Sequence, residues 1–142
     1  MALGVSAKLD LIKDVPLFEQ CSTEDLECIA EIADEIDLRA DKVLIQEGER
    51  GREFFVIVSG EVQVRRKGRK VATLGPGDFV GEMALLSKAP RNATVTAATA
   101  VDVLVITDRA FVGLLDKTPD LWHKVARTLA DRLGDNELGN PR

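Results

Sequence analysis

The chain has 142 residues, of which 45% are hydrophobic and 30% are charged, and its formal net charge is −5. This length and balance predict one globular domain over residues 1–142 and exclude a disordered chain. The negative net charge argues against sequence-independent binding of nucleic acid, which depends on Lys and Arg neutralising phosphates.

Membrane insertion and disulfide formation are not expected. No stretch approaches the roughly 18 consecutive apolar residues of a spanning helix, so the sequence predicts no membrane segment. Cys21 and Cys28 are the two cysteines, and on a helix they would lie about two turns apart, too far for a disulfide. We therefore expect a reduced, cytoplasmic protein.

The N-terminal part, over about residues 6–36, is predicted to be helical. Leu9, Ile12 and Val15 indicate a short helix that stops near Pro16. Ser22 with Asp25 is a capping-box variant that opens a second helix. The second helix would bury one apolar face, made by Leu26, Ile29, Ala30 and Ala33.

Over about residues 42–107 the hydrophobic pattern changes to a period of two. Short segments rich in Val, Ile, Thr and Phe are separated by turns that carry glycine. Strands of this length and spacing predict an antiparallel sandwich or barrel. The strand segments are KVLIQEG, EFFVIVSG, EVQVRR, KVATLGPG, ATVTA and VDVLVIT.

Over about residues 108–133 the pattern becomes helical again. Asp108 is predicted to cap one helix, and Pro119 lies near the start of a second that Gly134 ends. Residues 134–142 are expected to be a polar tail. The predicted fold class is therefore mainly β with flanking α: an antiparallel, jelly-roll-like β-roll with N-terminal helices and a C-terminal helix pair. The second C-terminal helix carries an apolar stripe at Leu121, Val125, Leu129 and Leu133.

The stretch GEMALLSKAPRNATV, residues 81–95, interrupts the strand pattern. Gly81 opens one apolar helical turn, whose first N–H groups lack internal partners and suit an anion. Pro90 restricts the backbone so that Arg91 can return over the same spot and grip two phosphate oxygens. Glu82 beside an anion needs a donor such as a sugar hydroxyl. These features predict a nucleotide site, and a surface ion pair between Glu82 and Arg91 is the alternative.

The run GEMALL followed by PRNATV closely resembles the phosphate-binding cassette of the cyclic nucleotide-binding domain family. This family includes protein kinase A regulatory subunits, cyclic nucleotide-gated channels and the catabolite activator. The resemblance extends to VPLFEQCSTEDLECIA, GREFFVIVSGEVQV and LGPGDFVGE and covers nearly all of residues 9–133. It implies a regulatory module whose ligand is cAMP or cGMP, with no cofactor, no metal and no catalysis.

The resemblance also implies roles for individual residues. Glu82 would accept a hydrogen bond from the ribose 2′-hydroxyl, with the Gly81 backbone nearby. Arg91 would pair with the exocyclic phosphate oxygens, and the N–H groups of Ala84 and Asn92 would point at the same phosphate. The complete ligand-binding set is Gly81, Glu82, Met83, Ala84, Arg91, Asn92 and Ala93, with Val64 and Ala72 as walls around the base and Arg132 as a lid.

Two positions depart from the pattern of the family. Val80 replaces a common aromatic residue, which would alter packing. Asn92 follows the arginine where Ala, Ser or Thr is usual, and because Asn both donates and accepts, it leaves cAMP against cGMP open. We favour cAMP. Packing by Leu129 or Leu133 is the alternative to a lid at Arg132.

Other residues have simpler interpretations. His123 is the only histidine and cannot supply the clustered ligands of a cupin-type metal site. Trp122 is expected to pack the last helix onto the roll. The basic hairpin over residues 65–70 is expected to be solvated, although it could contact an acidic partner.

We expect ligand binding to draw the cassette inward, so that the C-terminal helices repack over the base. The partner would be an effector protein or a fused effector domain, and monomer and homodimer both remain open. One alternative is a degenerate domain of the same fold that serves as a protein-interaction module. Another is a fragment of a channel, kinase or transcription factor, although residues 134–142 are too few for a helix-turn-helix that binds DNA.

Overall fold

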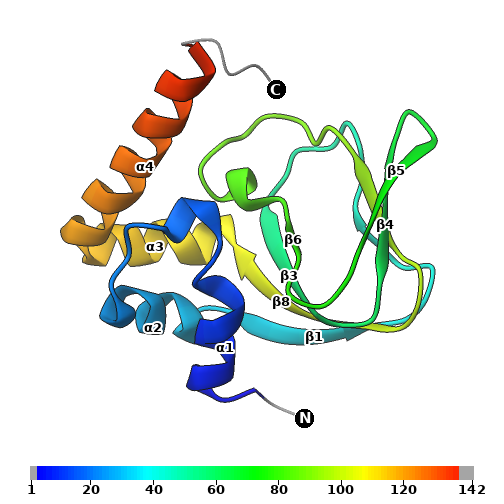
Figure 1. Ribbon diagram of the computed structural model, residues 1–142, viewed down its shortest axis with the longest axis horizontal. Coiled ribbons are helices and arrows are strands. Elements are labelled where there is room, and N and C mark those ends of the chain that lie inside the picture. The colour runs from blue at the N-terminus through cyan, green and yellow to red at the C-terminus, as the bar shows by residue number, and fades with distance from the viewer. Residues whose placement is uncertain (1–2, 138–142) are drawn as a thin grey trace.

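The computed structural model describes residues 3–137, with side chains over residues 3–131. In chain order a β-roll follows one group of helices and precedes another, and in space both groups gather on the same side of the roll (Figure 1). The helical elements are α1 (Val5–Ile12), the 3₁₀ turn η1 (Pro16–Phe18) and α2 (Thr23–Glu31) before the roll, and α3 (Asp108–Lys117) and α4 (Pro119–Glu137) after it.

The roll consists of two four-stranded antiparallel sheets, which confirms the predicted fold class. The first sheet has the order β1-β8-β3-β6, with strands Asp34–Leu38, Val101–Thr107, Glu53–Ser59 and Phe79–Val80. The second has the order β2-β7-β4-β5, with strands Val43–Ile45, Thr94–Ala97, Val62–Arg66 and Arg69–Leu74.

Strand β3 is buried on both faces, which explains its unbroken apolar run FFVIV. Phe54 faces the helices, whereas its neighbour Phe55 belongs to the core between the two sheets. The Phe54 ring lies 6.2 Å from the ring of Phe18 in η1, which in turn lies 5.8 Å from Phe111 in α3. Three aromatic rings therefore join the roll to both groups of helices.

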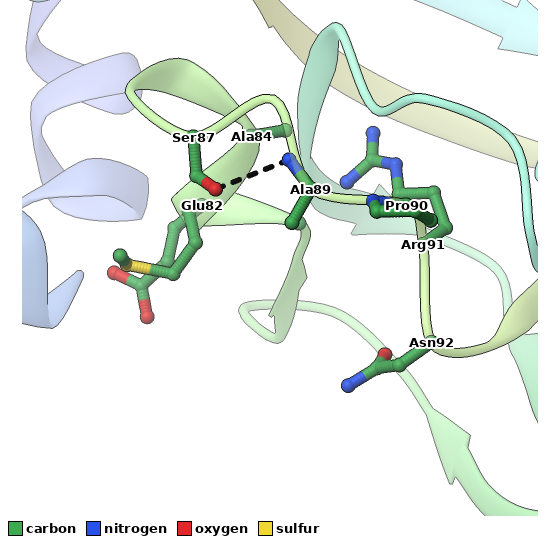
Figure 2. Close-up of a pocket in the computed structure, with 9 residues that line it drawn as sticks. Glu82, Ala84, Ser87, Ala89, Pro90, Arg91 and Asn92 are labelled. Atoms are coloured by element: carbon green, nitrogen blue, oxygen red, sulfur yellow. Dashed lines mark hydrogen bonds between the residues drawn. The ribbon is translucent and has the colours of Figure 1, made fainter.

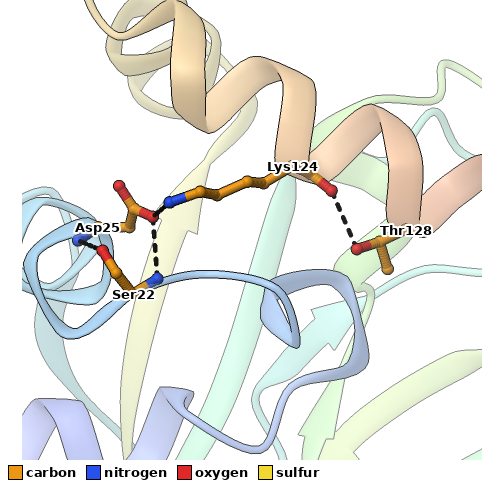
Figure 3. Close-up of polar contacts among 4 residues, drawn as sticks. All are labelled: Ser22, Asp25, Lys124 and Thr128. Carbon is orange, nitrogen blue, oxygen red and sulfur yellow. Dashed lines mark hydrogen bonds and ion pairs between the residues drawn. The ribbon is translucent and has the colours of Figure 1, made fainter.

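The capping box of α2 is confirmed. The Asp25 N–H donates to Ser22 Oγ at 3.1 Å, and the Ser22 N–H donates to Asp25 Oδ2 at 2.9 Å. Lys124 of α4 donates from Nζ to the same Asp25 oxygen at 2.6 Å, so one carboxylate caps α2 and holds α4 (Figure 3). Burial alone would raise the pKa of Asp25, but the hydrogen bonds from Lys124 and Ser22 outweigh it and hold that pKa below its usual value.

The prediction of N-terminal helices as far as about residue 36 was wrong. Helix α2 ends at Glu31, and residues 34–38 form β1, which pairs with β8 alone at the edge of its sheet. The sequence DEIDL did not indicate a strand, because charged residues are normally depleted in strands, although the edge of a sheet tolerates them. Ala33 is buried as expected, but it follows the helix.

The C-terminal helices also differ in detail from the prediction. The N-cap of α3 is Thr107, whose Oγ1 accepts from the Ala110 N–H at 3.1 Å, and not Asp108. Helix α4 runs through Gly134 to Glu137, because a single glycine costs a helix only about 1 kcal/mol. Leu121 and Val125 are buried, as the apolar stripe predicted. Between residues 3 and 137, no helix combines the length and apolar character that crossing a membrane requires.

Candidate functional site

The loop that connects β6 to β7 contains the 3₁₀ turn η2 (Glu82–Leu85), as the apolar turn predicted. Gly81 precedes η2 with φ 83° in the left-handed region, which residues other than glycine rarely adopt. Ala84 and Leu85 are buried and anchor the turn, whereas Met83 is exposed. Packing of η2 against β3 and α3 places the loop between the roll and the C-terminal helices.

A cavity of about 370 Å³ lies against this loop, within the range of about 300–1,000 Å³ typical of small-molecule sites. Glu82 and Arg91 lie on different sides of it, and the Glu82 carboxylate points away from the Arg91 guanidinium (Figure 2). The cavity is lined by Gly81, Glu82, Met83, Ala84, Ser87, Ala89, Pro90, Arg91 and Asn92.

The main chain holds Arg91 on the roll. Its N–H donates to the Glu49 carbonyl oxygen at 2.8 Å, and its own carbonyl oxygen accepts from the Gly48 N–H at 2.8 Å. Next to these bonds, Pro90 forms an isolated β-bridge with Arg50. These contacts fix the point from which the arginine side chain leaves the backbone.

The Arg91 guanidinium donates to the carbonyl oxygen of Glu53 in β3. It makes no salt bridge with any residue of the described part of the chain, so the alternative of a Glu82–Arg91 ion pair is wrong. Partial burial lowers the pKa of Arg91, and the negative charge of Glu53 offsets part of this shift. A half-buried cation that forms no salt bridge with the described residues therefore lines the cavity.

Two glycines make room for this side chain. A Cβ built on Gly51 would lie 2.7 Å from Arg91 Cζ, and one on Gly81 would lie 2.5 Å from Arg91 Nη1. Sequence reasoning missed Gly51, because the segment GERG around it is typical of any tight turn. It also missed Glu53, which contributes through a main-chain oxygen that any residue would supply.

Glu82 is connected to the N-terminal part of the chain. Its Oε2 accepts from the Leu17 N–H in η1 at 3.1 Å, a contact between residues 65 positions apart. Nothing in the sequence indicated Leu17, because the donor is a backbone group. The predicted ribose acceptor is thus held by a helical element outside the cassette.

The two backbone groups expected to face a phosphate behave differently. The Ala84 N–H donates to the Gly81 carbonyl oxygen at 3.0 Å, because η2 closes with i to i+3 bonds, and its contact with a phosphate stays a prediction. The Asn92 N–H makes no hydrogen bond with the residues described, and its side chain is exposed.

A second cavity, of about 170 Å³, adjoins the first and shares Gly81, Arg91 and Asn92 with it. Of the two walls predicted for a base, Val64 lines this cavity, and Ala72 pairs with Val64 from the neighbouring strand β5. The remaining lining residues are Ile45, Arg66, Val80, Ala93 and Val95. The side chain of Arg132, the predicted lid, lies outside the described residues.

A third cavity, of about 360 Å³, lies where the end of the cassette meets α3 and α4. Leu86, Val112 and Trp122 are among the residues that line it. Trp122 is 46% exposed, so the expectation that it packs α4 onto the roll was wrong. His123 and the basic hairpin are exposed, as expected.

Comparison with known proteins gives consistent results. A family model described as the cyclic nucleotide-binding domain matches residues 35–118. A cAMP-dependent protein kinase regulatory subunit from Mycosarcoma maydis is 43% identical over 128 residues, which cover 82% of this chain and 24% of the relative. The Pycsar effector protein PaPycTIR from Pseudomonas aeruginosa is 41% identical and covers 74% of this chain and 34% of its own length. The chain thus spans about a quarter to a third of these relatives.

Solved structures agree with the sequence relatives. The N-terminal domain of a transcriptional regulator from Streptomyces coelicolor A3(2) superposes with a TM-score of 0.81 at 28% identity, covering 92% of this chain and 96% of that domain. The catabolite activator protein of Thermus thermophilus reaches a TM-score of 0.66 at 28% identity, covering 87% of this chain and 60% of that protein. The chain belongs to the cyclic nucleotide-binding domain family.

Proposed function

We propose that this domain binds a cyclic nucleotide in the 81–95 loop and acts as a regulatory sensor. The observation that carries the proposal is Arg91, a half-buried cation that lines the cavity and whose guanidinium, among the described residues, hydrogen-bonds only the main-chain carbonyl oxygen of Glu53 in β3. Taking a guanidinium out of water costs free energy unless an anion compensates it. A cyclic phosphate supplies that anion, together with two oxygens that match the guanidinium fork.

The ligand would lie across both adjoining cavities. Its phosphate would meet Arg91 and the Asn92 N–H, and its ribose 2′-hydroxyl would donate to Glu82. The base would then rest against Val64 and Val80. Glu82 Oε2 accepts from Leu17 N–H, and a carboxylate has about four lone-pair sites, so the same carboxylate could also accept from the ribose hydroxyl.

cAMP is the ligand we favour over cGMP. The support comes from relatives: several at 33–43% identity are named cAMP-dependent protein kinase regulatory subunits, whereas a cGMP-dependent protein kinase from Toxoplasma gondii is 31% identical. Asn92 does not decide between them, because its amide can pair with either purine.

The signal would pass from the cassette to the C-terminal helices. The turn η2 packs against α3, and Leu86 shares an apolar cavity with Val112 and Trp122. A ligand that draws η2 inward would shift these contacts and the position of α4, with Arg132 as the proposed lid. The shift can be no larger than the difference in ligand affinity between the two arrangements.

The module would act without catalysis, in the cytoplasm, through an effector protein or a fused effector domain. The groups proposed at the phosphate, a guanidinium and a backbone amide, donate hydrogen bonds and hold a phosphodiester. Neither is a general base that would activate water. The effector is a proposal because the chain spans only part of its relatives.

Isothermal titration calorimetry of the protein with cAMP, cGMP and AMP tests the function. We expect both cyclic nucleotides to bind, with cAMP the tighter of the two. AMP should bind at least about tenfold more weakly than cAMP, because its phosphate carries a second negative charge and is not closed into the cyclic phosphodiester ring. In thermal denaturation, a ligand at 100 times its Kd should stabilise the fold by about 2.7 kcal/mol. If neither cAMP nor cGMP binds, the proposal is contradicted, and a protein-interaction module is favoured instead.

A further inference from the structure

The smaller cavity beside Arg91 contains a second arginine, Arg66, which the sequence had assigned to the solvated hairpin. Arg91 and Asn92 line both cavities. A ligand whose phosphate meets Arg91 can therefore place its base in the adjoining cavity, which is bounded by Val64 and Val80. Arg66 stands at that cavity, so the inference rests on the proposed function and concerns the base.

The position of Arg66 follows from the alternation of side chains along β4. Val62 is fully buried and Val64 packs against the core between the sheets, so the even-numbered residues of this strand face inward. Arg66 continues this row and reaches the cavity. Arg65 belongs to the other face, where its guanidinium donates to Gln63 Oε1 at 3.0 Å.

The guanidinium of Arg66 has N–H donors that could bond a ligand. Within residues 3–131, it makes no side-chain hydrogen bond and no salt bridge, and it is exposed at the end of the strand. A guanidinium has five N–H donors and no acceptor. A base edge that meets this guanidinium would therefore meet donors only.

The two purines differ at the edge that such a group reads. Guanine presents two adjacent acceptors, N7 and O6, whereas adenine presents the acceptor N7 beside the donor N6 amino group. An arginine can therefore bond guanine with two N–H groups but adenine with one. This difference acts on the base alone and leaves the phosphate contact unchanged.

We propose that Arg66 is a specificity-determining residue of the base site. Its guanidinium donates to N7 and to the C6 keto oxygen of a bound purine, and so narrows the preference of the domain for cAMP over cGMP.

The test compares Arg66→Ala with Arg65→Ala in calorimetric titrations of cAMP, cGMP and cyclic IMP. The two variants remove the same charge from the same exposed hairpin, but from opposite faces of β4. Cyclic IMP keeps N7 and the C6 keto oxygen of guanine but lacks its 2-amino group. We expect Arg66→Ala to weaken cGMP and cyclic IMP roughly tenfold and cAMP less than about threefold, and Arg65→Ala to change each Kd less than about twofold.

Arg66→Lys should retain part of the cGMP affinity, because an ammonium donates but does not reproduce the fork. Equal weakening of all three ligands by Arg66→Ala would overturn the inference, because it would indicate attraction of the phosphate charge. Identical Kd values for the two alanine variants would overturn it as well. Failure of the unmodified protein to bind any of the three would overturn the proposed function itself, whereas the first two results leave that function standing.

Discussion

Glu82 and Arg91, the two side chains of the 81–95 loop that are proposed to bind the ligand, are held by different parts of the molecule. Arg91 is tied to the roll through Gly48, Glu49 and Glu53. Glu82 is tied to η1 through Leu17, and it lies on a turn that packs against α3. The difference suggests how affinity and response could be separated in one loop: the proposed phosphate end is anchored on the sheets, and the proposed ribose end contacts helical elements.

The largest effect is expected at the anchored end. Arg91→Ala removes the phosphate partner and should weaken cAMP binding by roughly a hundredfold or more, as loss of one partner of a desolvated charge pair does. Arg91→Lys should recover only part of this loss, because one ammonium does not replace the fork. Calorimetry measures the Kd of cAMP for both variants. An unchanged Kd for Arg91→Ala would show that Arg91 does not bind the phosphate.

A smaller effect on cAMP affinity is expected from Gly51, which packs against the Arg91 side chain. In Gly51→Ala the new Cβ would lie 2.7 Å from Arg91 Cζ and 2.8 Å from Cδ, so the arginine side chain must move. We expect cAMP affinity to fall roughly tenfold while the protein stays folded. The matched control is Gly113→Ala in α3, where an added Cβ meets no atom within 4 Å. Equal affinities for these two variants would show that the position of the guanidinium does not matter.

Two serine to alanine variants, one in the N-terminal helices and one in the 81–95 loop, should separate effects on stability from effects on ligand affinity. Ser22→Ala removes the cap of α2 and should cost about 1 kcal/mol of unfolding free energy, with cAMP affinity unchanged. Ser87→Ala removes a side chain that accepts from the Ala89 N–H at 3.2 Å inside the cassette, and it should lower affinity more than stability. Chemical denaturation and calorimetry on both variants check this, and the reverse pattern would refute it.

The smallest effect concerns a stability change that leaves the site untouched. Burial raises the pKa of Asp102 to about 6, aided by Glu35 and Asp37 across the β1–β8 pair. Because the folded state holds this proton more tightly than the unfolded chain, the contribution of Asp102 to stability is greatest at low pH and falls as pH rises from about 4 to about 6. Asp102→Asn should flatten this dependence by on the order of 1 kcal/mol and leave cAMP affinity unchanged. Thermal denaturation across that pH range measures it, and an unchanged slope would contradict the assignment.

Sequence reasoning succeeded where one local pattern dominates. The apolar, β-branched and aromatic run of β3, the Ser22 capping box and the apolar turn after Gly81 each depend on neighbours in the chain, and the structure has all three. It failed at β1, where pairing with a distant strand overrides unfavourable residues. It also failed for the partners of Arg91 and Glu82, since the Glu53 oxygen and the Leu17 N–H are backbone groups without a sequence signal.

The hydrogen bond between Leu17 and Glu82 has a consequence for the order of assembly. It closes a loop of 65 positions, and such closure costs conformational entropy before the contact can repay it. We therefore expect the acid to reach its final position only once η1 has docked, so that the ligand site forms late in folding. During synthesis, the segment that completes the site would leave the ribosome well before the cassette that needs it.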